Sequence, residues 1–171
     1  MKQITIYILC TFVALSLCAC LSTKEPPSIG TINNLYFDNK ENIDTVVDFM
    51  ANTEHKTILI DDSCETMYAD FQTIEIPDHI TKNAIKHLID KGVIIAFYKD
   101  HEQIQLIVWE RPQIRCWIAY STNGTVPDVQ YATESIAMEE AGWYYVIADY
   151  NEWRTQKTGD KGTDGSPVST P

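Results

Sequence analysis

Two segments of the chain repeat apolar residues at the spacing of an α-helix. Residues 41–54 place four apolar side chains at positions i, i+3, i+4 and i+7 of one helical face: Ile43, Val46, Val47 and Met50. The second segment starts after Asp78, which suits an N-cap, and it stops at Gly92. Its apolar side is formed by Ile80, Ala84, Ile85, Leu88 and Ile89. The pattern therefore predicts two amphipathic helices.

The rest of the central region follows the two-residue period of β-strands. Short strands are predicted at 57–60 and 73–76, separated by residues 61–70, whose composition favours turns. Further strands are predicted at 93–99, 104–110, 114–121, 129–138 and 143–149. The short polar connections between successive strands suit hairpins better than helical crossovers. We therefore predict an α+β fold, with two helices packed on a mainly antiparallel sheet in two layers.

The N-terminal segment differs from this pattern, because it is apolar on every side. Lys2 precedes a run of 16 residues, Ile4–Ala19, that contains no charge. The run is shorter than the roughly 20 residues that a membrane-spanning helix needs. A basic start, a short apolar stretch and a small terminal residue predict a secretory signal peptide. A packed core helix or an uncleaved membrane anchor is the alternative interpretation.

The end of this segment resembles the lipobox of bacterial lipoproteins. Leu17-Cys18-Ala19-Cys20 has the Leu, the small residue and the obligatory Cys of that motif, although Cys is unusual at its variable position. The resemblance implies cleavage between Ala19 and Cys20 and a diacylglyceryl group on the Cys20 thiol. Two or more acyl chains make a stable membrane anchor. A plain core cysteine is the alternative for Cys20.

These observations divide the chain into four parts. We expect a signal peptide at 1–19, a lipidated cysteine with a polar, Pro-rich tether at 20–34, a globular α+β domain at 35–154 and a disordered tail at 155–171. The formal net charge of the chain is −11, and removal of residues 1–19 changes it to −12. This acidity makes a nucleic-acid partner unlikely on physical grounds. The lipid on Cys20 would therefore supply the attachment to the membrane.

Two cysteines, Cys64 and Cys116, remain after the predicted cleavage. Outside the cytoplasm they are candidates for a disulfide, and two separate thiols are the alternative. Cys64 follows Asp61 and Asp62, so a hydrolase that uses Cys64 or the Asp61/Asp62 pair is a second functional hypothesis. Nearby carboxylates disfavour a reactive thiolate. No enzymatic activity is therefore expected in the preferred interpretation.

The sequence also contains no spacing of His residues typical of a metal site, and no nucleophile elbow or phosphate-binding loop. No cofactor and no metal are expected. The aromatic residues near the C-terminus are the best binding candidates, because rings exposed on a sheet can stack on sugars or receive a peptide. The candidate platform consists of Trp109, Trp117, Tyr144 and Trp153. Packing within the sheet is the alternative role for these rings.

The sequence thus predicts a membrane-anchored extracytoplasmic lipoprotein. Its partners would be the membrane, through the lipid on Cys20, and an envelope protein or glycan held by the small acidic domain.

Overall fold

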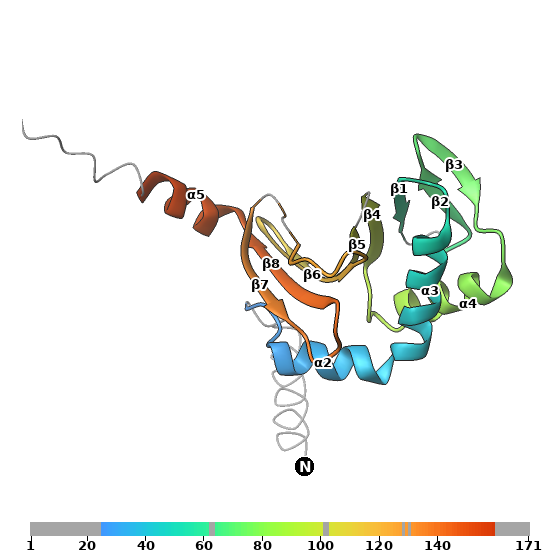
Figure 1. Ribbon diagram of the computed structural model, residues 1–171, viewed down its shortest axis with the longest axis horizontal. Helices are drawn as coiled ribbons and strands as arrows, with labels where there is room; N and C mark the ends of the chain where they lie inside the picture. Colours follow the sequence, from blue (N-terminus) through green and yellow to red (C-terminus); the bar gives the residue numbers. More distant parts are fainter. Residues whose placement is uncertain (1–24, 62–63, 101–102, 128, 130, 160–171) are drawn as a thin grey trace, which may run out of the picture.

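A computed structural model describes residues 25–61, 64–100, 103–127, 129 and 131–159. The described residues form four helices and eight strands (Figure 1). The helices are α2 (Ile29–Asp38), α3 (Lys40–Asn52), α4 (His79–Asp90) and α5 (Tyr150–Gly159). The strands are β1 (Thr57–Ile60), β2 (Thr66–Ala69), β3 (Gln72–Glu75), β4 (Ala96–Asp100), β5 (Gln103–Arg111), β6 (Ile114–Ser121), β7 (Ala132–Ala137) and β8 (Trp143–Asp149).

All eight strands belong to one sheet, in the order β3-β2-β1-β4-β5-β6-β8-β7, and every neighbouring pair is antiparallel. The predicted hairpins β4–β5, β5–β6 and β7–β8 are confirmed. The chain departs from a simple meander after β6, because β6 pairs with β8 and leaves β7 at the sheet edge.

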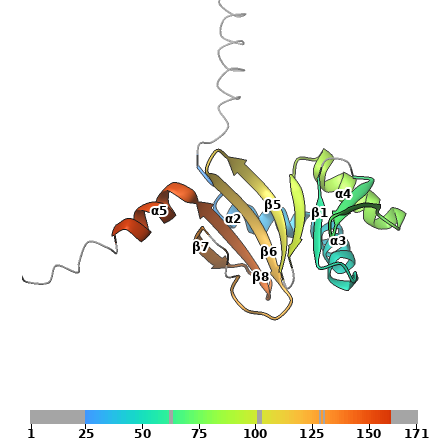
Figure 2. The same ribbon diagram turned by 90° about the horizontal axis from the view of Figure 1, so that it is seen from above.

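The sheet is curved, and α2, α3 and α4 lie along its convex side (Figure 1). Seen from above, α2 passes behind the central strands (Figure 2). We call this side the helix-covered face and the concave side the open face. The main core lies on the helix-covered face, where alternate residues of the inner strands are buried, among them Ile58, Phe97, Leu106 and Ile118. The alternation follows from the two-residue period of strands.

Both predicted helices are confirmed. The buried residues of α3 are Ile43, Val46, Val47 and Met50, the four that the pattern assigned to one face. Helix α4 begins after Asp78, whose side chain accepts a hydrogen bond from the backbone N–H of Thr81 at 2.7 Å. Ile80 is an exception, because it is 61% exposed rather than packed with the apolar side.

The prediction of two helices in a two-layer arrangement is too simple. Helix α2 begins at Ile29, inside the segment assigned to the tether, so the domain boundary at residue 35 is wrong. Ser28 caps this helix by accepting a hydrogen bond from the N–H of Thr31, and Ile32 and Tyr36 are fully buried. At the other end α5 extends to Gly159, past the predicted domain end at residue 154. Strand β2 occupies residues that were assigned to a turn.

The predicted signal peptide and lipobox, with Cys20, lie outside the described residues. None of the helices in the described part of the chain is long and apolar enough to cross a membrane.

Candidate functional site

The open face carries a pocket at the end of the β5–β6 hairpin, with a volume of about 330 Å³. Strands β5, β6 and β8 form its floor, and the segments before β7 and at the start of α5 form its wall. Its lining residues combine aromatic rings with charged and amide groups: Gln105, Glu110, Arg111, Gln113, Ile114, Arg115, Trp117, Val129, Tyr131, Ala148 and Tyr150. This mixture is typical of a ligand site, where apolar surface gives affinity and a few polar groups give orientation.

Trp117 is the most informative of these residues. Its side chain is only 3% exposed, and its indole Nε1 is buried with no hydrogen-bond partner among the described residues. Most buried donors in native proteins have a partner, and leaving one without a partner costs about 1–3 kcal/mol. A ligand that offers an acceptor to this N–H would remove that cost.

Trp117 is held in place by a second, smaller apolar cluster on the open face. Its buried members are Ile107, Trp117, Ala119 and Val146, and Val129 and Ala132 pack against them. Nearby, the Tyr144 hydroxyl donates a hydrogen bond to the carbonyl oxygen of Gly124 at 3.2 Å. The connection between β6 and β7 thus covers part of the open face and fixes one wall of the pocket.

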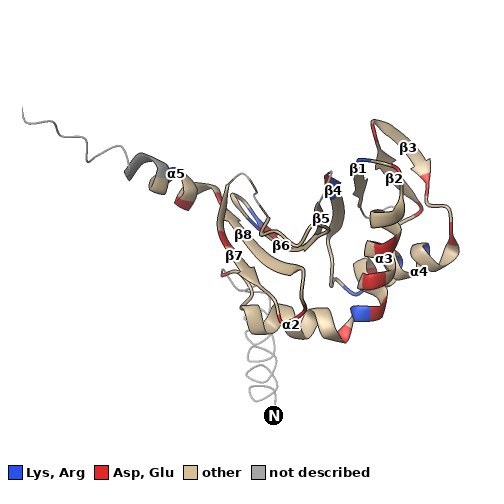
Figure 3. Ribbon diagram, viewed as in Figure 1, with Lys and Arg blue, Asp and Glu red and all other residues tan. Residues whose placement is uncertain are grey.

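The pocket has an excess of positive charge. Arg115 and Glu110 face each other across the β5–β6 pair, and the Arg115 Nε donates a hydrogen bond to Glu110 Oε1 at 2.9 Å. Arg111 lines the same pocket. The acidic residues of α3, which are Glu41, Asp44 and Asp48, belong to the helix on the other side of the sheet (Figure 3). The pocket is therefore locally cationic although the protein as a whole is acidic. This charge favours ligands that carry hydrogen-bond acceptors.

The backbone around the pocket adopts unusual conformations. Gln113 and Tyr131 both have positive φ, at 75° and 72°. Gln113 is fixed by the first residues of α5: its carbonyl oxygen accepts a hydrogen bond from the N–H of Tyr150 at 2.9 Å, and its side chain accepts one from Asn151. Positive φ at non-glycine residues is uncommon and concentrates at functional positions.

A second hollow of about 380 Å³ lies on the same face, over β1, β2 and β3. Leu59, Tyr68 and Thr73 line it and stand opposite one another in the strand register. Tyr98 is the register partner of Leu59 on one side and of Gln105, which lines the first pocket, on the other. One row of side chains therefore connects the two hollows. The rings of Tyr68 and Tyr98 are 47% and 36% exposed.

The predicted aromatic platform is thus not a single surface. Trp117 lines the pocket. Trp153 reaches its rim through Tyr131, with ring centroids 4.6 Å apart. Trp109 instead packs against the main core, because a bulge in β5 aligns it with Cys116 on the helix-covered face.

The sequence reasoning missed Arg115 and Gln105. A signal for Arg115 existed, since Arg115 and Trp117 are two residues apart on one strand and must share a face.

The predicted disulfide is not formed. Cys64 and Cys116 are both buried thiols. Cys116 lies on β6, and β4 and β5 separate that strand from β1, after which Cys64 follows. At the usual strand spacing this is about 14 Å, beyond the reach of a disulfide. Burial raises the pKa of the Cys116 thiol.

The residues of the alternative hydrolase are not assembled into a site that the structure describes. Cys64 is 7% exposed and packs with the main core, whereas a nucleophilic thiol needs access to substrate. Asp61 is exposed, and Asp62 lies outside the described residues. Among the described residues no group of three or more His, Cys, Asp or Glu side chains could hold a metal ion.

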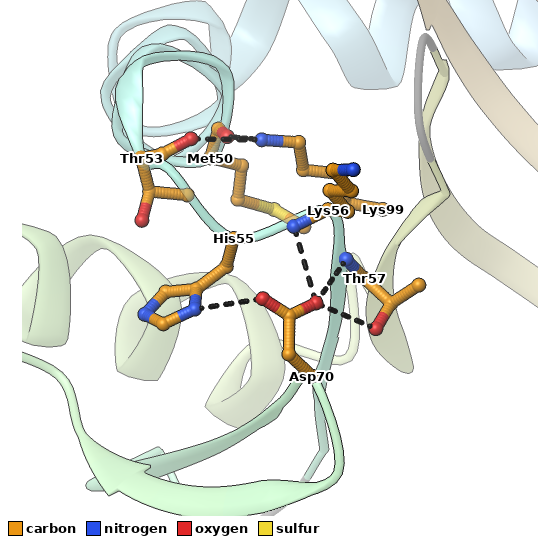
Figure 4. A network of polar contacts seen from close by, with 7 residues as sticks. All are labelled: Met50, Thr53, His55, Lys56, Thr57, Asp70 and Lys99. Atoms are coloured by element: carbon orange, nitrogen blue, oxygen red, sulfur yellow. Dashed lines mark hydrogen bonds and ion pairs between the residues drawn. The ribbon is translucent and has the colours of Figure 1, made fainter.

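A second polar cluster joins α3 to the sheet (Figure 4). The Asp70 carboxylate accepts hydrogen bonds from the backbone N–H groups of Thr57 and Lys56, at 3.0 and 3.2 Å, and lies 3.1 Å from His55 Nδ1. The hydrogen bond from Thr57, followed by that from His55, lowers the pKa of Asp70 to about 2. These contacts tie the hairpin tip to the start of β1, which is a structural role.

The fold and the pocket together define an antiparallel α+β domain with one helix-covered face and one face that carries a ligand-sized pocket. Comparison of the chain with models of protein families, with curated proteins and with solved structures finds no match. We therefore infer function from the residues of the pocket and the sheet.

Proposed function

We propose that the chain is an extracytoplasmic lipoprotein, anchored through Cys20, whose open face binds another component of the cell envelope or its surroundings. The observation that carries this proposal is the pocket on the face opposite the side from which the tether leaves. This arrangement suits a membrane-anchored binding protein, because its site then faces away from the bilayer.

The hydroxyl of Tyr145 supports this orientation. It donates a hydrogen bond to the carbonyl oxygen of Pro27 at 2.8 Å, and Tyr145 is a buried residue of the helix-covered face. The last residues before α2 are therefore held on that face. From Glu25 back to Cys20 the chain can span at most about 17 Å. A lipid on Cys20 would accordingly keep the helix-covered face toward the membrane and the pocket away from it.

The charge supports lipid attachment over binding to headgroups. The mature chain has a net charge of −12, so anionic lipid surfaces repel it. Stable association would then depend on acyl chains.

The anchor is tested by expressing the full chain in a bacterium and determining the mass of the mature N-terminal peptide. We expect Cys20 as the first residue, carrying a diacylglyceryl group, and membrane retention that is lost in Cys20→Ala. Cys18→Ala is the matched control, because it removes a neighbouring thiol and should leave retention unchanged. Membrane retention of Cys20→Ala would refute the anchor.

The binding role is tested with the mature Cys20→Ala chain, immobilised and exposed to solubilised envelope fractions. A component retained by this chain should be lost with Trp117→Phe, which removes the indole N–H but keeps an aromatic ring. It should remain with Trp109→Phe, the same change on the other face. Equal retention by both variants would show that the pocket is not the binding site.

A further inference from the structure

Two hollows that the described residues form on the open face are joined by a single row of side chains. Leu59 belongs to the hollow over β1–β3 and Gln105 to the pocket over β5–β8, with Tyr98 between them in register. Leu59 and Gln105 are two strand spacings apart, which is about 10 Å. A ligand that uses both hollows must therefore be elongated and must cross the strands.

The chemistry of this row excludes strand addition as the mode of binding. Strands β1, β4, β5 and β6 are interior strands, so their backbone groups are already paired with neighbouring strands. A peptide that adds to a sheet needs backbone groups at an edge. The open face offers side chains alone: exposed tyrosine rings at Tyr68 and Tyr98, and amide or hydroxyl groups at Gln105 and Thr73.

A sugar chain fits this combination. Each sugar ring has an apolar C–H side that packs on an aromatic ring, and a rim of hydroxyls that hydrogen-bond with amides and guanidinium groups. The buried Nε1–H of Trp117 needs an acceptor, and Arg115 adds further donors at the same end of the row. The volume of about 330 Å³ lies within the range of small-molecule sites.

We infer that the open face binds a linear oligosaccharide, with one end in the pocket beside Trp117 and the following sugars crossing Tyr98 toward Leu59 and Tyr68. This inference rests on the proposed function, since it names the class of component that the anchored domain binds. It predicts that affinity rises with chain length until both hollows are occupied.

The experiment measures the binding of the mature Cys20→Ala chain to β-linked oligosaccharides of one to six sugars by calorimetry. One series consists of N-acetylglucosamine, the chemistry of a cell-wall glycan, and the other of glucose, the chemistry of environmental glucans. We expect affinity to rise at least tenfold from the dimer to the longest oligomer in one of the two series. The series that binds more tightly identifies the source of the glycan.

Two variants separate the two parts of the surface. Trp117→Phe should weaken the binding of every oligomer by about tenfold, the equivalent of one lost hydrogen bond. Tyr98→Ala should leave the binding of the dimer unchanged and remove the gain with length. Trp109→Phe is the matched control for Trp117→Phe, because it makes the same change on the helix-covered face. Phe37→Ala is the control for Tyr98→Ala, because it truncates a partly exposed aromatic ring on α2.

Absence of binding in both series, or binding that does not depend on length or on Trp117, overturns the glycan inference. Retention of an envelope protein that is lost with Trp117→Phe, without any oligosaccharide binding, would also overturn it but leave the proposed function standing. An unlipidated Cys20 would refute the anchor without changing the oligosaccharide result. The two proposals therefore fail in distinguishable ways.

Discussion

The two faces of the sheet are built from alternate residues of the same strands, and yet they have different properties. On β4, Phe97 is fully buried under the helices, and its neighbour Tyr98 is 36% exposed on the open face. On β1, Ile58 and Ile60 are buried and Leu59, between them, is 39% exposed. Helices α2, α3 and α4 supply the cover on one side, and no helix among the described residues covers β1, β2 and β4 on the open face.

Apolar character alone therefore does not decide which face forms the core. Leu59, Tyr68 and Tyr98 are as apolar or aromatic as many core residues, but they remain accessible. On the open face, residues of β5, β6 and β8 are buried, because the β6–β7 connection packs on Trp117 and Val146. A face with one buried half and one solvent-accessible half combines a rigid floor with exposed aromatic rings. Both features suit a binding surface.

The largest expected effect is the difference in unfolding free energy between Phe97→Ala and Tyr98→Ala, two neighbouring residues of β4. Phe97→Ala should lower the free energy of unfolding by about 3–5 kcal/mol, because it opens a cavity in the main core. Tyr98→Ala should cost only about 1 kcal/mol, since Tyr98 is 36% exposed and its loss opens no cavity in the main core. Urea unfolding of both variants in the mature Cys20→Ala chain measures the difference. Equal losses would contradict the division of the sheet into two faces.

A smaller effect is expected at Lys99, which is a charged side chain buried on the helix-covered face at 6% exposure. Its Nζ donates hydrogen bonds to the carbonyl oxygens of Met50 and Thr53, at 2.6 and 3.2 Å, where α3 ends (Figure 4). Burial lowers the pKa of Lys99. Lys99→Met should lower the free energy of unfolding by about 1–2 kcal/mol, because two carbonyls lose their donor.

The exposed Lys56 provides the control for Lys99. Lys56→Met removes the same charge from the surface beside the same helix, and it should change stability by less than about 0.5 kcal/mol. A loss as large as that of Lys99→Met would show that net charge rather than the cap on α3 sets the effect. Thermal unfolding of the two variants at one pH decides between these outcomes.

Local patterns in the sequence predicted those elements whose neighbours along the chain are also their neighbours in space. The spacing of apolar residues predicted the buried face of α3. The two-residue period and the short connections predicted the hairpins β4–β5, β5–β6 and β7–β8. Helix α2 was missed because it carries only two fully buried apolar residues, Ile32 and Tyr36, which is too few to establish a helical period, and its third buried residue is the polar Asn33. Strand β2 has only four residues between two turns, too few to establish a period.

The candidate site was predictable only in part. The period of β6 places Arg115 and Trp117 on one face, but it does not say which face the helices cover. That choice depends on the order β6-β8-β7, a long-range pairing that no local pattern specifies. The bulge in β5, which turns Trp109 toward the core, has the same origin. The sequence left the disulfide and two separate thiols as alternatives, because sequence alone does not give the number of strands between two cysteines.

The tip of the β2–β3 hairpin belongs to neither face of the sheet. Its two loop residues have a strained backbone conformation, and substitutions there measure the cost of that strain. Asp70 and Phe71 form a two-residue loop in which both have positive φ, at 45° and 72°, and Phe71 is 84% exposed. Such loops favour glycine at the second position, because a bulky residue is strained there. Phe71→Gly should therefore raise the free energy of unfolding by about 0.5–1 kcal/mol, as measured by urea unfolding. Gln72→Gly, one residue further into the strand, should lower it by a similar amount.

The smallest expected effect is a change in acid stability at Asp70, the first residue of the same hairpin loop. The folded-state pKa of about 2 lies below the ordinary value of 3.8, so the carboxylate contributes stability that is fully present above pH 4 and lost as the pH falls toward 2. Asp70→Asn removes this contribution and still tolerates positive φ. The difference in melting temperature between the original chain and this variant should therefore be larger at pH 6 than at pH 2.

High salt separates the two physical causes of that difference. The hydrogen bond from the Thr57 N–H is the main cause of the lowered pKa of Asp70, and a hydrogen bond is screened by salt much less than a distant charge. The difference between the two melting temperatures at pH 6 should accordingly persist in 0.5 M salt, a concentration at which charge interactions beyond about 5 Å are largely screened. A difference that disappears in salt would show that the general acidity of the chain, rather than this contact, governs the hairpin tip.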